Sequence, residues 1–139
     1  MTQRILSHFL LFTLSFFFLA SCSKYEEGNA SLASKKSRLV NHWRTQQITS
    51  NGTDITSLNI ITDIIIRDNN TMTINGAFWG VPTTAEAKWV FNAKKTNVLI
   101  TNSDGSLDDY AIVMLQKDEA KFRRIDDDGN VILYHFVTY

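Results

Sequence analysis

The chain has 139 residues, of which 14 are acidic and 14 are basic. This length predicts one domain. Zero formal net charge argues against a nucleic-acid-binding surface, which needs a dense positive face. The single cysteine excludes an intrachain disulfide framework and the cysteine-rich metal modules. Composition therefore leaves a small globular domain whose role must be sought in its motifs.

The first 21 residues have the pattern of a secretory signal peptide. A short positive start that ends at Arg4 precedes the apolar run from Ile5 to Ala20. These are the n-region and h-region of such a signal. The run is short for a membrane span, which needs about 20 residues, although an N-terminal anchor helix is the alternative. We expect residues 1–21 to be cleaved from the mature protein.

The sequence Leu19-Ala20-Ser21-Cys22 resembles the bacterial lipobox, in which the cysteine thiol is acylated and the preceding peptide bond is cut. The only cysteine in the chain lies where this chemistry needs a thiol nucleophile. Several acyl chains on Cys22 would anchor the protein stably, whereas one chain is marginal. The motif predicts a lipoprotein of the bacterial cell envelope, with the outer membrane favoured and its periplasmic or surface face left open.

Residues 22–37 are predicted to form the acylated cysteine and a flexible linker. This stretch is rich in Ser, Lys, Glu and Ala and has no periodic apolar pattern. A folded domain is expected over residues 38–139. The predicted organisation is thus a signal peptide, a tether and one domain.

The domain reads as short β-strands separated by turn residues. Asn51-Gly52, Asp104-Gly105 and Asp128-Gly129 favour tight turns because these residues tolerate positive φ. Asp68-Asn69-Asn70 has the same character, and Thr53 to Leu58 has room for one short helical turn. Alternation with period two predicts strands near residues 39–49, 60–67, 71–78, 85–92, 97–102, 109–116, 120–126 and 130–138.

Pro82 is predicted to break the pairing between the third and fourth of these strands, because proline cannot donate to a ladder. Eight short strands joined mainly by hairpins can form a sandwich or a barrel, and only the barrel removes both sheet edges. The predicted fold class is therefore all-β, with a small eight-stranded up-and-down antiparallel barrel. Such a barrel has an interior just wide enough for side chains or for one small ligand.

The segment Leu39-Val40-Asn41-His42-Trp43-Arg44 resembles the L-x-G-x-W start of the lipocalin-like domain lipoproteins of Bacteroidota. The turn at residues 51–55, the strand start Trp89-Val90-Phe91-Asn92 and the approach to the last strand at residues 128–131 also fit that family. The resemblance covers residues 38–139 and implies a lipocalin-like barrel with an apolar cavity and no catalytic residues. Asn41 departs from the pattern, because the family usually has glycine there, which puts a close backbone approach at the closed end in doubt.

Four aromatic residues are candidates for the lining of such a cavity: Trp43, Phe78, Trp89 and Phe91. Apolar pockets are the usual architecture of ligand sites. The alternative is that these rings simply fill the core, as in many small barrels. Trp79 lies in a glycine-flanked apolar stretch and is a candidate exposed aromatic at a barrel mouth or a partner surface.

Neither a metal site nor catalysis is predicted. His42 and His135 lie in the first and last strands, which are neighbours if the barrel closes, but the sequence defines no third ligand. Asp126-Asp127-Asp128-Gly129 lacks the spaced ligands of a calcium loop and reads as a solvated hairpin turn. The sequence has no nucleophile elbow, zinc-protease motif or phosphate-binding glycine loop. We therefore expect no enzyme activity and no cofactor.

The leading functional hypothesis is a cell-envelope lipoprotein whose barrel binds or carries a small hydrophobic ligand. The alternative is a structural or interaction lipoprotein whose barrel is filled and whose outer surface docks an envelope partner. The residues expected to face inward do not decide between them. Gly76 and Ala87 would leave room in the interior, whereas Trp89 and Phe91 would take it.

Overall fold

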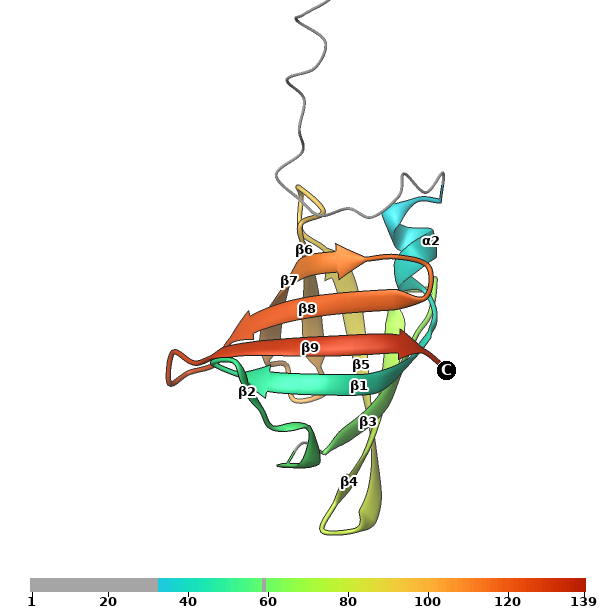
Figure 1. Cartoon of the computed structure of the whole chain (residues 1–139). Coiled ribbons are helices and arrows are strands. Elements are labelled where there is room, and N and C mark those ends of the chain that lie inside the picture. Colours follow the sequence, from blue (N-terminus) through green and yellow to red (C-terminus); the bar gives the residue numbers. More distant parts are fainter. Residues whose placement is uncertain (1–32, 59) are drawn as a thin grey trace, which may run out of the picture.

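The structure, a computed structural model, describes residues 33–58 and 60–139 (Figure 1). One antiparallel sheet has the strand order β2-β1-β3-β4-β5-β6-β7-β8-β9, and β9 also pairs with β1. Two short helices, α2 (Lys35–Leu39) and the 3₁₀ turn η2 (Thr56–Leu58), accompany it. The strands are β1 (His42–Ser50), β2 (Thr53–Asp54), β3 (Ile61–Ile66), β4 (Thr71–Phe78), β5 (Val81–Phe91), β6 (Asn97–Asn102), β7 (Leu107–Leu115), β8 (Glu119–Ile125) and β9 (Val131–Thr138).

Pairing between the first and last long strands closes the sheet into a barrel. The β1–β9 ladder runs from Trp43↔Thr138 to Ser50↔Ile132 with one irregularity near Thr45. β1 and β3 to β9 therefore form a closed barrel of eight strands, while β2 only extends the end of β1. This confirms the predicted all-β, up-and-down antiparallel barrel, in which the first and last long strands pair with each other instead of lying at the edges of an open sheet.

The turn chemistry follows the sequence prediction. Asn51 and Gly52 both have positive φ, at 49° and 83°, as a two-residue hairpin turn requires. Asn70, Gly105 and Gly129 also have positive φ, at the other three predicted turns. These residues set the hairpins because they adopt the left-handed region at little steric cost.

The prediction for Pro82 is wrong. β4 and β5 form a continuous hairpin around Trp79-Gly80, and Pro82 lies directly opposite Ala77 within it. The amide of Ala77 points away from β5 and donates to the carbonyl of Ile60 at 2.8 Å. Ala77 and Pro82 therefore form a non-hydrogen-bonded pair of the ladder, in which the missing N–H of proline is not needed. The pairing of β5 with β6 begins only at Ala87, so the proline lies on a free edge, where it costs no ladder bond.

Helix α2 covers one end of the barrel, which we call the closed end (Figure 1). The hydroxyl of Ser34 caps this helix by accepting from the amide of Ser37, and the helix ends at the fully buried Leu39. Arg38 donates to the carbonyl of Leu115 at 2.9 Å, which ties α2 to the end of β7. Residues 35–37, predicted to belong to the linker, therefore lie in a helix that packs on the barrel.

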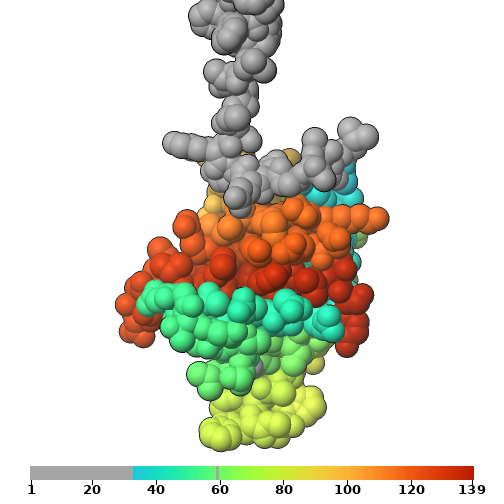
Figure 2. Space-filling view, viewed as in Figure 1, coloured from blue at the N-terminus to red at the C-terminus, as the bar shows by residue number. Residues whose placement is uncertain are grey.

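The opposite end of the barrel is the mouth. There the tip of the β4–β5 hairpin projects beyond the other strands (Figures 1 and 2). The core lies between the mouth and α2 and is formed by side chains from α2 and from every long strand. The predicted signal peptide, Cys22 and most of the predicted tether lie outside the described residues. Within the described part of the chain, no helix combines the length and the apolar character needed to cross a bilayer.

Candidate functional site

The barrel encloses an apolar cavity of about 50 Å³. Period-two alternation directs one face of each strand into the interior, so side chains from six strands and α2 meet there. Its lining residues are Leu39, Ile61, Ile64, Ile66, Met72, Ile74, Val98, Ile100, Tyr110, Phe122, Tyr134 and Phe136.

Of these twelve lining residues, only Tyr110 and Tyr134 have a polar group in the side chain. The ring of Tyr110 meets the ring of Tyr134 edge to face, with centroids 5.6 Å apart. Tyr110 on β7 and Tyr134 on β9 lie nearer the mouth than Ile112 and Phe136, which follow them on the same faces of their strands. The cavity is thus apolar in its depth and carries hydroxyl groups toward the mouth.

An ion pair lies next to these tyrosines. Asp108 and Arg124 share the inward alternation of Tyr110 and Phe122, two residues closer to the mouth on β7 and β8. Nη2 of Arg124 lies 3.1 Å from Oδ1 of Asp108, and the guanidinium lies 6.0 Å from the centre of the Tyr110 ring. Asn102 donates to the second oxygen of Asp108 at 2.9 Å. We call Asn102, Asp108, Tyr110, Arg124 and Tyr134 the rim cluster.

The rim cluster keeps its tyrosines neutral. Burial raises the pKa of Tyr110 well above its usual value, and the neighbouring Tyr134 and the charge of Asp108 add to this, outweighing the opposite effect of Arg124. Burial also raises the pKa of Tyr134, although Arg124 and hydrogen bonding with Tyr110 act against it. Both hydroxyls are therefore protonated at neutral pH and can donate as well as accept hydrogen bonds.

None of the four aromatic residues predicted to line a cavity lies among the residues that line this one. Trp43 and Trp89 are fully buried at the closed end, where each indole N–H donates to a backbone carbonyl. Lys36 of α2 lies 6.0 Å from the Trp89 ring, which places that ring beneath the helix. These tryptophans pack the closed end, as the alternative prediction for them held.

The other two predicted lining residues lie at opposite ends of β4 and β5. Phe91 is half-buried and packs edge to face against Trp89, with ring centroids 5.5 Å apart. Phe78 is exposed at the hairpin tip, past the mouth. Both residues lie on the predicted face of their strand. Along the barrel axis, however, Phe91 lies beyond one end of the cavity and Phe78 beyond the other.

Trp79 is exposed at the tip of the β4–β5 hairpin, as predicted. Its side chain is 89% accessible and contacts the edge of Phe78, and its backbone has a φ of 52°. Positive φ is unusual for a large side chain. Val81 is also exposed, and Leu58 and Ile60 lie exposed beside the same end of the barrel. Neither residues 71–85 nor residues 55–62 include a charged residue, so the hairpin tip is an apolar, uncharged surface.

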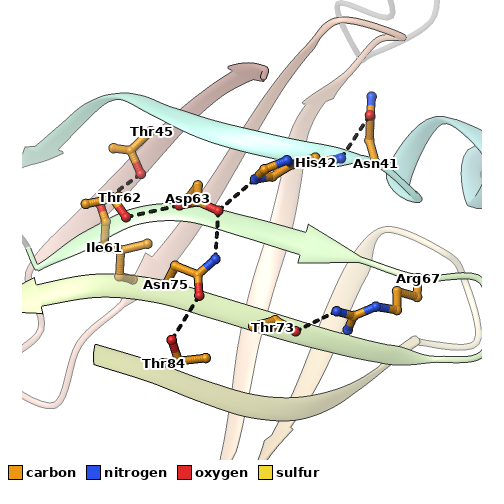
Figure 3. Close-up of polar contacts among 10 residues, drawn as sticks. All are labelled: Asn41, His42, Thr45, Ile61, Thr62, Asp63, Arg67, Thr73, Asn75 and Thr84. Carbon is orange, nitrogen blue, oxygen red and sulfur yellow. Dashed lines mark hydrogen bonds and ion pairs between the residues drawn. The ribbon is translucent and has the colours of Figure 1, made fainter. Parts of the chain in front are cut away.

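The outer wall carries a polar network centred on Asp63 (Figure 3). His42 Nε2 lies 2.7 Å from Asp63 Oδ2, and Asn75 donates to the same oxygen at 2.9 Å. The ring of His42 stacks on Tyr139, with centroids 4.3 Å apart. Burial would raise the pKa of Asp63, but hydrogen bonds from Asn75, His42 and Thr62 outweigh it and lower that pKa. The network joins β1, β3 and β4 on the outside of the barrel.

The two histidines do not form one site. His135 pairs in register with Gln47 rather than with His42, and its Nε2 lies 2.8 Å from Oε1 of Glu119. Five residues of extended strand, roughly 16 Å, separate Gln47 from His42. In residues 33–58 and 60–139, no group of three or more His, Cys, Asp or Glu side chains has a metal-binding arrangement.

The acidic run before Gly129 forms a hairpin turn. Oδ1 of Asp126 accepts from the amides of Asp128 and Asn130, and its Oδ2 accepts from the Asn130 side chain at 3.0 Å. These hydrogen bonds, the side-chain bond from Asn130 first, lower the pKa of Asp126. The carboxylate therefore organises its own loop, as an Asx turn does.

The structure places Asn41 without strain. Its φ is not positive, its side chain donates to the carbonyl of Lys117 at 3.2 Å, and its own carbonyl accepts from Ile66. Asn41 thus links the start of β1 to the β7–β8 turn. The sequence analysis did not predict the rim cluster. The period-two alternation could have indicated it, because it places Asp108, Tyr110 and Ile112 on one face of β7 and Phe122 and Arg124 on one face of β8.

Comparison with solved structures shows which fold this is. Bovine odorant-binding protein in complex with a selenium-containing odorant matches with a TM-score of 0.51 and 15% identity, over 81% of this chain and 77% of that chain. Its complex with undecanal gives 0.51 and 17%, over 82% and 77%. Odorant-binding protein OBP1 gives 0.52 and 12%, over 78% and 77%. No protein-family model and no curated protein matches the sequence. The domain is lipocalin-like in fold.

Proposed function

We propose that this protein binds a small hydrophobic ligand inside its barrel. The observation that carries the proposal is the apolar cavity inside the barrel, between α2 and the mouth, lined by aliphatic and aromatic side chains from across the barrel. Concave apolar interiors with a few polar groups are the usual form of ligand sites. The structural neighbours support it as well, because they were solved with an odorant or with undecanal bound.

The volume of the cavity limits the ligand. Drug-sized molecules occupy pockets of roughly 300–1,000 Å³, whereas this cavity measures about 50 Å³. The cavity thus suits a short aliphatic tail better than it suits a drug-sized molecule. We therefore assign the site to small ligands and not to long lipids.

Methyl NMR of the chain tests this proposal. We expect n-pentane, added to the protein matured from the full chain and held in lipid nanodiscs, to shift the methyl signals of Ile74 and Ile100. Both residues line the cavity. The Ile74→Phe variant fills the space and should abolish the shift of the remaining Ile100 signal, whereas Val113→Phe adds a ring at an exposed position and should preserve both shifts. Unchanged methyl signals in the unsubstituted protein would contradict binding of a hydrocarbon in this cavity.

We also propose that the protein is a lipoprotein of the bacterial cell envelope, anchored in the outer membrane through acyl chains on Cys22. The support is the lipobox-like sequence around the only cysteine. Incorporation of labelled palmitate is expected for the full chain and for Ser23→Ala, and is expected to be lost in Cys22→Ala. Labelling that persists in Cys22→Ala would overturn the lipoprotein proposal.

A second function has one observation in its favour. The uncharged hairpin tip formed by Phe78, Trp79 and Val81 is exposed, and contiguous apolar surface often marks an interaction site. In that case the barrel is a scaffold that docks an envelope partner. Crosslinking in the cell from residue 79, compared with crosslinking from residue 113 on the outer wall, tests it. A specific adduct from position 79 alone supports docking, and equal labelling from both positions opposes it.

A further inference from the structure

The rim cluster places polar groups directly above the apolar cavity. Tyr110 and Tyr134 belong both to the cavity lining and to the rim cluster, so a molecule in the cavity touches them. Asp108 on β7 and Arg124 on β8 share the inward alternation as well, and each lies two residues closer to the mouth than Tyr110 and Phe122. A ligand whose tail enters the cavity therefore has its other end at these side chains.

The charges of the rim cluster are already balanced. Arg124 pairs with Asp108 at 3.1 Å, and the second oxygen of Asp108 accepts from Asn102 at 2.9 Å. Asp126, which lies outside the rim cluster, places a further negative charge near Tyr134. A ligand carboxylate would add a further negative charge without a free cation to pair with it, which is costly in a partly desolvated site. The rim thus disfavours anionic ligands.

The tyrosine hydroxyls supply what a neutral oxygen needs. A hydroxyl group both donates and accepts, so Tyr110 and Tyr134 can bond to each other and to a ligand oxygen at once. Tyr110 and Tyr134 share one hydrogen bond, so one hydroxyl hydrogen of the pair would lack a partner beneath a pure hydrocarbon. Burying an unpaired polar group is unfavourable. The rim therefore favours a ligand that has an oxygen at one end.

We infer that the barrel selects short neutral alcohols or ketones, whose oxygen bonds to the hydroxyls of Tyr110 and Tyr134 while a short aliphatic tail fills the cavity. This inference rests on the proposed ligand-binding function and names its ligand class. Arg124 and Asp108 act as the neutral ion pair that excludes carboxylates.

Three ligands of equal chain length test the inference: 1-pentanol, pentanoate and n-pentane. Dissociation constants are measured by methyl NMR at pH 7 on the protein matured from the full chain in nanodiscs, with empty nanodiscs as the control for partitioning. We expect 1-pentanol to bind about fivefold more tightly than n-pentane, the effect of about one net hydrogen bond. Pentanoate is expected to bind at least tenfold more weakly than 1-pentanol.

Two kinds of variant locate the selectivity. Tyr110→Phe together with Tyr134→Phe should remove the preference for 1-pentanol over n-pentane, while Tyr139→Phe, an exposed residue on the outer wall, should preserve it. Asp108→Asn leaves the charge of Arg124 unpaired, so it should strengthen pentanoate binding about tenfold. The ligand preferences of the unsubstituted protein test the inference even where a variant does not fold.

The outcomes separate this inference from the function on which it rests. Equal affinity for 1-pentanol and n-pentane, or tighter binding of pentanoate than of 1-pentanol, would overturn the inference and keep the proposed binding function. Failure of all three ligands to bind would overturn both.

Discussion

The indole N–H of Trp43 donates to the carbonyl oxygen of Leu39 across 2.9 Å, and both residues are fully buried. This bond fixes the start of β1 against the last residue of α2, so the helix and the barrel share one core. Trp43 therefore contributes to stability through the burial of its ring and through a satisfied carbonyl. The closed end of the barrel depends on both contributions.

Replacing Trp43 separates the two. Trp43→Ala is expected to lower the free energy of unfolding by about 3–5 kcal/mol, because a large buried ring is lost. Trp43→Phe retains an aromatic ring but leaves the buried Leu39 carbonyl without its donor, so a loss of about 1–3 kcal/mol is expected. Urea denaturation measures both, with the exposed Trp79→Ala as the control. An unchanged midpoint in Trp43→Ala would contradict the burial of this ring.

Much of this fold follows from the local pattern of the sequence. β4 and β6 have the predicted bounds, Thr71–Phe78 and Asn97–Asn102, because turn residues and alternation mark both ends of each strand. Helix α2 was missed because five residues are too short to show a helical period. It is stabilised by its cap and by Leu39 in the core, and the second of these is a tertiary contact.

The candidate site was harder to predict for a different reason. Alternation reveals which face of a strand points inward, but it does not reveal the depth of a residue along the barrel. Phe78 shares the face of Ile74, yet four residues of strand carry it roughly 13 Å farther, beyond the mouth. Trp89 and Phe91 are displaced in the opposite direction, toward α2. The register of the strands fixes depth, and it depends on the pairing of the whole barrel.

The lowered pKa of Asp63 predicts an acid-sensitive outer wall. Because the folded pKa lies below the unfolded value of about 3.9, the ionised carboxylate stabilises the folded state above pH 4. That stabilisation is lost as the pH falls through the folded pKa. The melting temperature should therefore fall between pH 4 and pH 2, and it should fall less steeply in Asp63→Asn. Asp68→Asn, in an exposed turn, is the control and should retain the slope of the unsubstituted protein.

A glycine at the mouth is predicted to resist substitution. A Cβ atom on Gly76 would overlap the carbonyl oxygen of Ile60, which is backbone and cannot rotate away. Gly76→Ala should therefore lower the free energy of unfolding by about 1–3 kcal/mol. It should also move the methyl signal of Ile61, a residue that lines the cavity. Gly105→Ala, which has open space but a φ of 85°, should cost stability through backbone strain and leave that signal in place. An unshifted Ile61 signal in Gly76→Ala would oppose the close approach.

Trp79 offers a substitution that is expected to increase stability. It occupies a hairpin turn with a φ of 52°, followed by Gly80 at 79°, the conformation in which Asn-Gly is strongly preferred. Trp79→Asn relieves the strain of a bulky side chain at positive φ and removes only the exposed contact with Phe78. The free energy of unfolding should rise by about 0.5–1 kcal/mol.

The matched control for this change is Trp79→Ala, which removes the same ring but keeps a residue that disfavours positive φ. Thermal and urea denaturation should show stabilisation in Trp79→Asn and no gain in Trp79→Ala. If Trp79→Asn lowers stability, the ring contributes more to the fold than its 89% exposure indicates. If it raises stability as expected, the indole at this tip is dispensable for folding, and crosslinking from position 79 then tests its role in docking.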